Sequence, residues 1–176
     1  MTMLNWLKNY WFDPEFKRKQ LFLQKVSFFK GVPRREFGRL FQALMMRNYL
    51  EGEILFKEGD VGRALFILET GKVEISRLNS AGLPQRVAVM RPGDYFGEMS
   101  LLDDLPRTAS ARAMEPTRVY LLYKTELDTL LQNAPRVGCA IMAHLAELLA
   151  GRLRVMMDQM HTASTKEVPP LVKEVF

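Results

Sequence analysis

The sequence contains very little cysteine, because Cys139 is the only one among 176 residues. A single thiol excludes an internal disulfide and provides too few ligands for a zinc ribbon or an iron-sulfur cluster. Histidine is also scarce, with two residues, and no metal site is expected. These shortages favour a protein of a reducing compartment.

Long hydrophobic runs are missing as well. The longest uncharged stretch toward the C-terminus, Val137–Ala146, is about half of the roughly 18 to 20 residues needed to cross a bilayer. The N-terminus has no continuous hydrophobic region followed by a small-residue cleavage site. The sequence therefore predicts a cytoplasmic protein without a membrane span.

Sequence patterns of catalysis are absent too. There is no Gly-x-Ser-x-Gly motif, no His-Glu-x-x-His motif and no P-loop. The composition, 48% hydrophobic and 26% charged, is that of an ordinary globular protein. Because a domain has about 150 residues, a chain of 176 residues is expected to form one domain with extensions at one or both ends. We expect a binding protein rather than an enzyme.

The net charge of +5 is concentrated near the N-terminus. Residues 1–35 contain eight Lys and Arg but only two Asp and Glu. Such a segment is more often a solvated helix face than a nucleic-acid-binding surface. Apolar and aromatic residues accompany these lysines: Leu4, Trp6, Leu7, Tyr10, Trp11 and Phe12. They can pack on the domain or a partner, or they can form an interfacial helix on a membrane.

Three zones follow one another along the chain. Residues 1–48 show helical spacing of apolar residues, and the last helix is expected to extend to about Met46. Residues 49–122 consist of short β-type runs separated by turn glycines, which is typical of a β-sandwich or roll. Residues 123–161 return to helical periodicity, and residues 162–176 are expected to be an irregular tail. The predicted fold class is α+β: an antiparallel, jelly-roll-like β-roll of about eight strands between N-terminal helices and a C-terminal helix.

An apolar stripe marks the predicted C-terminal helix. Its members recur every three or four residues: Met142, Leu145, Leu149, Leu153, Met156 and Met160. The stripe can pack against the β-roll, or against a second copy of itself as a coiled-coil-like seam. The sequence leaves both possibilities open, so a homodimer through this helix is one expectation.

The segment 96–111 does not alternate as a strand does. It indicates a turn, one helical turn, a loop and the start of a strand. Gly97 can adopt positive φ and allows a ligand to approach the backbone closely. The backbone N–H groups that could face an anion belong to Met99, Ser100, Thr108 and Ala109.

Two charged side chains complete this predicted anion site. Arg107 supplies a positive charge whose planar guanidinium can bind two phosphate oxygens at once. Glu98 would repel an anion unless it accepts a hydrogen bond, and a ribose 2′-hydroxyl next to a phosphate is the natural donor. Asp103 and Asp104 would oppose a phosphate unless the loop turns them to solvent.

These residues resemble a known family. Phe96-Gly97-Glu98-Met99-Ser100-Leu101-Leu102, followed after four residues by Arg107-Thr108-Ala109, is similar to the phosphate-binding cassette of cyclic nucleotide-binding domains. The resemblance extends from about Leu23 to Leu153. It implies a cytoplasmic receptor for cAMP or cGMP, in which Arg107 binds the cyclic phosphate and Glu98 binds the ribose 2′-hydroxyl. The residues that contribute backbone groups are then Gly97, Met99, Ser100 and Ala109.

The resemblance also indicates where the base would lie. Val87 and Val89 are the candidates for an apolar wall, and the C-terminal helix would cover the base. Its candidate capping residues are Arg152, Arg154 and Met156. A hydroxyl after the arginine, here Thr108, accompanies cGMP in eukaryotic kinases but also occurs in bacterial cAMP binders. We expect cAMP to be favoured over cGMP.

Bacterial transcription regulators of this family continue into a helix-turn-helix, for which the residues after Met160 are too few. No direct DNA binding is therefore expected, and an unknown downstream protein would receive the signal. Haem is not expected, because His144 and His161 lie on the predicted C-terminal helix. The alternative function is a degenerate cassette that binds no nucleotide, in an interaction module whose basic N-terminal helix binds a protein or a membrane surface.

Overall fold

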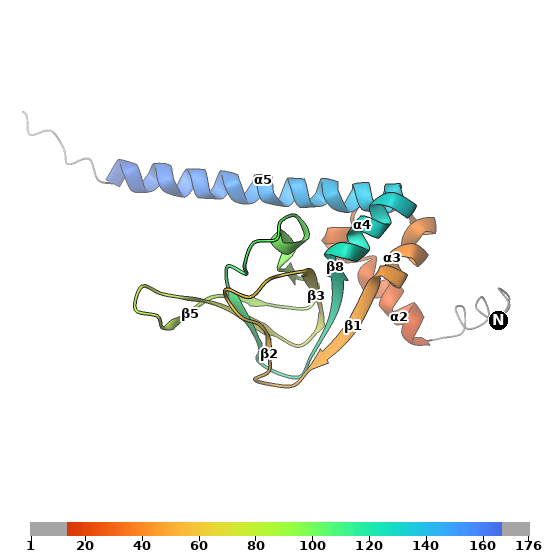
Figure 1. The fold of residues 1–176 in the computed structure, drawn as a ribbon, viewed down its shortest axis with the longest axis horizontal. Coiled ribbons are helices and arrows are strands. Elements are labelled where there is room, and N and C mark those ends of the chain that lie inside the picture. Colours follow the sequence, from red (N-terminus) through yellow and green to blue (C-terminus); the bar gives the residue numbers. More distant parts are fainter. Residues whose placement is uncertain (1–13, 167–176) are drawn as a thin grey trace, which may run out of the picture.

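The computed structural model describes residues 14–166 (Figure 1). The described chain begins with the helices α2 (Pro14–Leu23), η1 (Ser27–Phe29), η2 (Arg34–Glu36) and α3 (Phe37–Ala43). Eight strands follow: β1 (Leu44–Tyr49), β2 (Ile54–Phe56), β3 (Ala64–Thr70), β4 (Val73–Leu78), β5 (Pro84–Met90), β6 (Tyr95–Phe96), β7 (Ser110–Ala113) and β8 (Thr117–Tyr123). The short 3-10 helix η3 (Glu98–Leu101) lies between β6 and β7, and the helices α4 (Lys124–Asn133) and α5 (Pro135–Lys166) end the described part.

The strands form two four-stranded antiparallel sheets. Their orders are β1-β8-β3-β6 and β2-β7-β4-β5. The inner faces enclose one apolar cluster, to which β3 contributes Phe66 and Leu68. The alternate residues of β3, Leu65 and Ile67, point to a second cluster under the helices. Because β3 is buried on both faces, its apolar residues form a continuous run and do not alternate with polar ones. The predicted α+β fold with an antiparallel roll is confirmed.

The helices cover one outer face of the β1-β8-β3-β6 sheet. Leu23 and Leu40 from the N-terminal helices meet Leu127 of α4 and Ile141 and Leu145 of α5 in this second cluster. Figure 1 shows α2, α3 and α4 gathered at one end of the roll, with α5 running across its top. The first part of α5 thereby packs against α4 and η1.

The predicted boundary between helix and roll is wrong by a few residues. A helix was expected to continue to about Met46, but α3 ends at Ala43 and strand β1 begins at Leu44. Residues 44–49 pair with residues 117–122 of β8, Leu44 opposite Leu122 and Tyr49 opposite Thr117. These backbone hydrogen bonds override the helix propensity of the Leu-Met-Met-Arg run, which the sequence alone does not reveal.

Helix α5 extends beyond the roll (Figure 1). It continues to Lys166, so the prediction of an irregular tail from residue 162 is wrong for 162–166, where no Gly or Pro stops the helix. The remaining tail residues and the aromatic segment of residues 4–12 lie outside the described residues. Among the helices of the described chain, none is long and apolar enough to cross a membrane.

Candidate functional site

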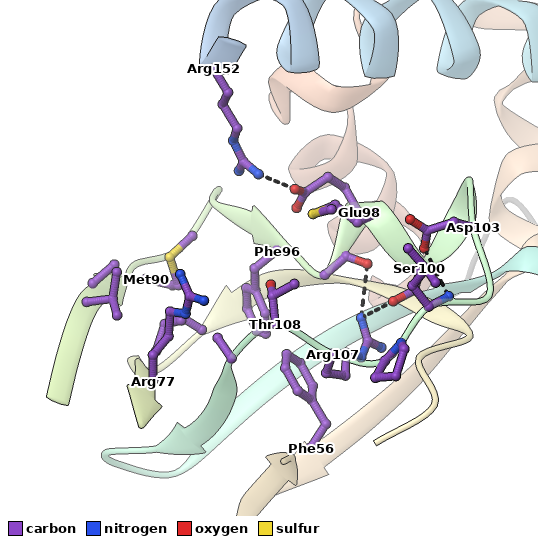
Figure 2. Close-up of a pocket in the computed structure, with 18 residues that line it drawn as sticks. Phe56, Arg77, Met90, Phe96, Glu98, Ser100, Asp103, Arg107, Thr108 and Arg152 are labelled. Atoms are coloured by element: carbon purple, nitrogen blue, oxygen red, sulfur yellow. Dashed lines mark hydrogen bonds and ion pairs between the residues drawn. The ribbon is translucent and has the colours of Figure 1, made fainter. Parts of the chain in front are cut away.

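A hollow of about 320 Å³ opens between β4, β5 and the segment that joins β6 to β7 (Figure 2). This volume is at the lower end of the roughly 300 to 1,000 Å³ of small-molecule sites. Its lining residues are Phe56, Ile75, Arg77, Val87, Ala88, Met90, Phe96, Gly97, Glu98, Met99, Ser100, Asp103, Leu105, Pro106, Arg107, Thr108, Ala109 and Arg152. The whole predicted anion-binding set therefore lies around one cavity.

Gly97 forms the turn that the predicted cassette requires. Strand β6 ends at Phe96, Gly97 adopts the left-handed conformation with φ 76°, and η3 begins at Glu98. A β-carbon at position 97 would lie 2.5 Å from Nη1 of Arg107. Glycine is therefore required both for the backbone conformation and for the close approach of the guanidinium.

Arg107 is held rigidly in the wall of the hollow, with 8% of its surface exposed. Its Nη1 donates to the Gly97 carbonyl at 3.0 Å and to Ser100 Oγ at 2.7 Å, and its Nη2 donates to the Ala64 carbonyl at 2.8 Å. These three hydrogen bonds occupy only some of the five N–H donors of the guanidinium. The guanidinium is thus positioned before a ligand arrives and keeps donors for one.

Aromatic rings and acidic groups define the electrostatics of Arg107. Its Cζ lies 4.3 Å from the ring centroid of Phe56 and 5.5 Å from that of Phe66. Burial lowers the pKa of the guanidinium, and the negative charges of Glu98 and Asp60 raise it. Since the ordinary pKa of arginine is far above neutrality, Arg107 remains a cation at physiological pH.

Glu98 is also buried, with 3% of its surface exposed. Its Oε1 accepts a hydrogen bond from Nη1 of Arg152, which comes from α5 (Figure 2). Of the three candidate capping residues, Arg152 lines the hollow, whereas Arg154 and Met156 do not. Helix α5 therefore contacts the site through one ion pair.

Of the two residues predicted to form the base wall, one lines the hollow and the other does not. Val87 lines the hollow together with Ala88 and Met90 of the same strand, and Val89 does not. The register of β5 with β4 shifts beside Ile75, which pairs with Ala88, so Val87 is the extra residue of a β-bulge. The bulge interrupts the alternation of side chains, so that Val87 and Ala88 both reach the cavity.

The two acidic residues of the loop behave differently. Asp104 forms an ion pair with Lys124 of α4 at 2.9 Å, so it is turned from the site. Asp103, expected to face solvent, lines the hollow instead, and its Oδ1 lies 3.4 Å from the Leu105 nitrogen of its own loop. Of these two loop carboxylates, that of Asp103 thus remains in the wall and lowers the positive potential of the anion site.

Gly62 supports the site but was not predicted from the sequence. A β-carbon there would lie 2.0 Å from Ser100 Oγ and 2.7 Å from Nε of Arg107. Its φ is not positive, so the turn pattern of Gly59-Asp60-Val61-Gly62 gives no conformational reason for glycine at this place. The reason is close packing against the cassette, which becomes visible only in three dimensions.

A second contact joins the cassette to α5. The hydroxyl of Tyr95, at the start of β6, lies 2.9 Å from Nε2 of His144. The ring of Phe28 packs against both, with centroids 5.0 Å and 5.5 Å away. His144 is thus a half-buried helix residue, and within the described residues no cluster of three or more His, Cys, Asp or Glu side chains is arranged to hold a metal ion.

Comparisons with known proteins agree with this geometry. Residues 46–134 match the cyclic nucleotide-binding domain family. The chain is 38% identical over 126 residues to the cyclic AMP receptor protein of Thermus thermophilus, covering 72% of this chain and 56% of that protein. It is 34% identical over 122 residues to a cGMP-dependent protein kinase of Eimeria tenella, covering 69% of this chain and 12% of the kinase. The chain therefore spans only part of these relatives.

The fold is shared as well. The crystal structure of the Thermus thermophilus catabolite activator protein superposes with a TM-score of 0.71 and 34% identity, covering 78% of this chain and 62% of that one. The residues matched to the family, 46–134, include β2 to β8 and the cassette with Gly97, Glu98 and Arg107. The chain belongs to the cyclic nucleotide-binding domain family.

Proposed function

We propose that the chain is a receptor for a purine 3′,5′-cyclic nucleotide and that it favours cAMP over cGMP. The observation that carries this proposal is the convergence of Arg107 and Glu98 on one hollow of suitable size. A cation with spare donors and a buried carboxylate in one cavity suit a ligand with an anionic group beside a hydroxyl donor. The name of the Thermus relative, a cyclic AMP receptor, supports the choice of cAMP.

The hollow accommodates each part of such a ligand separately. The cyclic phosphate would lie at Arg107, where other cassette residues also line the cavity: Gly97, Met99, Ser100, Thr108 and Ala109. The ribose 2′-hydroxyl would donate to Glu98. The purine would then lie against the apolar wall of Ile75, Val87, Ala88 and Met90. This is recognition without bond making, so the proposed role is binding rather than catalysis.

The test is calorimetric titration of the full chain with cAMP and, separately, with cGMP. We expect binding at tens of micromolar or tighter, with cAMP the tighter ligand. If neither nucleotide binds in this range, the receptor function is wrong and a degenerate cassette is favoured. If cGMP binds more tightly, only the proposed preference is wrong.

We further propose that the bound nucleotide draws α5 toward the cassette. Before binding, the negative charge of Glu98 interacts with the two cations Arg107 and Arg152. A phosphate at Arg107 would offset the first of these attractions, so Glu98 would depend more strongly on Arg152. The ion pair, already formed, would be strengthened, α5 would be held over the base, and a downstream protein could detect the altered helix position.

This coupling predicts the behaviour of Arg152→Ala. The variant should bind cAMP several-fold more weakly, because closure of α5 would lose its electrostatic contact. A spin-label or fluorescence distance between α5 and β5 should also stop responding to cAMP. The matched control is Arg154→Ala on the same helix, which does not line the hollow and should behave as wild type. Unchanged or tighter binding by Arg152→Ala would contradict the closure.

We also propose that the distal part of α5 pairs with a second copy of the chain. Leu153, Met156 and Met160 of the predicted stripe are 57%, 58% and 70% exposed. A cluster of large apolar side chains on one helix is costly to leave in water. Size-exclusion chromatography with light scattering should show a dimer, and Leu153→Glu with Met156→Glu should give a monomer. Arg154→Glu is the control, and a wild-type monomer would contradict the pairing.

A further inference from the structure

Arg77 of β4 places a second arginine in the wall of the hollow, at a distance from the anion site. Arg77 lines the cavity, although no sequence motif predicts this position. Figure 2 shows Arg77 and Met90 at one end of the cavity and Ser100 and Asp103 at the other. If the phosphate lies at Arg107, Arg77 lies at the end that remains for the base.

The guanidinium of Arg77 is available to a ligand. Arg107 and Arg152, the other two lining arginines, are both engaged, with the cassette and with Glu98. By contrast, the side chain of Arg77 forms no hydrogen bond or ion pair with any residue in the part of the chain that the structure describes. The acidic residue closest to it along β4, Glu74, already binds two other arginines.

The surroundings of Arg77 are otherwise apolar at this end. Ile75 precedes it by two residues, and Val87, Ala88 and Met90 come from the paired strand. A purine against these side chains would find few groups able to recognise its polar edge. Arg77 is therefore the side chain in this part of the lining that can distinguish one purine from another.

We propose that Arg77 recognises the polar edge of the purine and favours a 6-oxopurine. This inference rests on the proposed function, because it requires a cyclic nucleotide in the hollow. A guanidinium presents two parallel N–H donors, which match the O6 and N7 acceptors of guanine. Adenine offers the N7 acceptor but carries an amino donor at position 6, so one of the two donors of Arg77 would face another donor. Arg77 thus reduces, rather than creates, the preference for cAMP.

The test compares three cyclic nucleotides by calorimetry on the 176-residue chain and on its Arg77→Gln variant. cGMP and cyclic inosine monophosphate both carry O6 and N7, whereas cAMP carries N7 and the 6-amino group. We expect Arg77→Gln to weaken both 6-oxopurine ligands about tenfold more than it weakens cAMP. Arg86→Gln is the matched control, because Arg86 is an exposed arginine of the neighbouring strand that does not line the hollow.

Each outcome separates the inference from the function on which it rests. If the wild-type chain binds none of the three ligands, the receptor function itself is wrong. If it binds them and Arg77→Gln weakens all three equally, Arg77 contacts a group that all three ligands share, such as the phosphate or N7, and does not favour a 6-oxopurine. If Arg77→Gln changes none of them, Arg77 does not touch the ligand. A loss for cGMP without a loss for the inosine ligand would mean that the effect depends on the guanine 2-amino group and not on O6 and N7, which would contradict the inference.

Discussion

Arg107→Ala should lose cyclic nucleotide binding, with a dissociation constant for cAMP at least about 30-fold higher than that of the wild type. Truncating one partner of a buried, hydrogen-bonded charge pair costs roughly 2 to 5 kcal/mol, because the remaining charge stays without its partner. Here the group left unpartnered would be the cyclic phosphate. Calorimetric titration of the variant with cAMP measures the loss directly.

Controls are needed because Arg107 also supports the fold. Its side chain satisfies the buried carbonyl of Ala64, so its removal should lower the melting temperature as well. Arg107→Lys keeps the charge but loses the planar pair of donors, and we expect its affinity to lie between those of alanine and wild type. Arg112→Ala, at an exposed position outside the hollow, should bind normally. Binding by a folded Arg107→Ala within about threefold of wild type would contradict the site, because the expected loss is at least ten times larger.

Gly62→Ala should have the second largest effect. The new methyl group would lie 2.0 Å from Ser100 Oγ and 2.7 Å from Nε of Arg107, and both side chains would have to move. Overpacking of this kind costs about 1 to 3 kcal/mol of stability. Because Arg107 is the group displaced, cAMP affinity should fall by about tenfold or more. Thermal unfolding and calorimetry of the same preparation measure the two effects.

Gly59→Ala is the matched control for this substitution. Gly59 lies in the same loop with φ 88°, and a β-carbon there would meet no atom within 4 Å. Its replacement should cost about 1 to 2 kcal/mol of stability through backbone strain alone and leave cAMP affinity close to wild type. Equal loss of binding in both variants would mean that loop conformation, rather than contact with Arg107, controls the site. Normal binding by Gly62→Ala would show that the close packing is dispensable.

The cassette could be predicted from the sequence because its parts are local. Only one turn, one short helix and one loop separate Gly97, Glu98 and Arg107. Their spacing in the sequence therefore determines how the three residues are arranged in space. Arg77 and Gly62 could not be found in this way, because segments distant in the sequence bring Arg77 into the lining of the cavity and Gly62 against the side chains of Ser100 and Arg107. Val89 was misplaced because a bulge shifts the alternation of β5, and no residue type marks such a bulge.

The choice among Arg152, Arg154 and Met156 also required the three-dimensional structure. All three lie on the same helix, and which of them faces the cassette depends on how α5 is rotated and seated. That seating is set by contacts earlier on α5, such as His144 with Tyr95 and Ile141 within the core. Helical periodicity gives the spacing of residues on a face, but it does not give the position of that face over the roll.

The three hydrogen bonds of Arg107 have a kinetic consequence. A binding loop that must first be ordered slows association and reduces affinity by the entropy lost on ordering. Here the guanidinium is already fixed against Gly97, Ser100 and Ala64. Nucleotide capture should therefore proceed at a rate set by diffusion and orientation, and the lifetime of the complex should be governed by dissociation alone. Such a receptor would respond quickly to a rise in nucleotide concentration, and its rate of dissociation would set how quickly it resets after a fall.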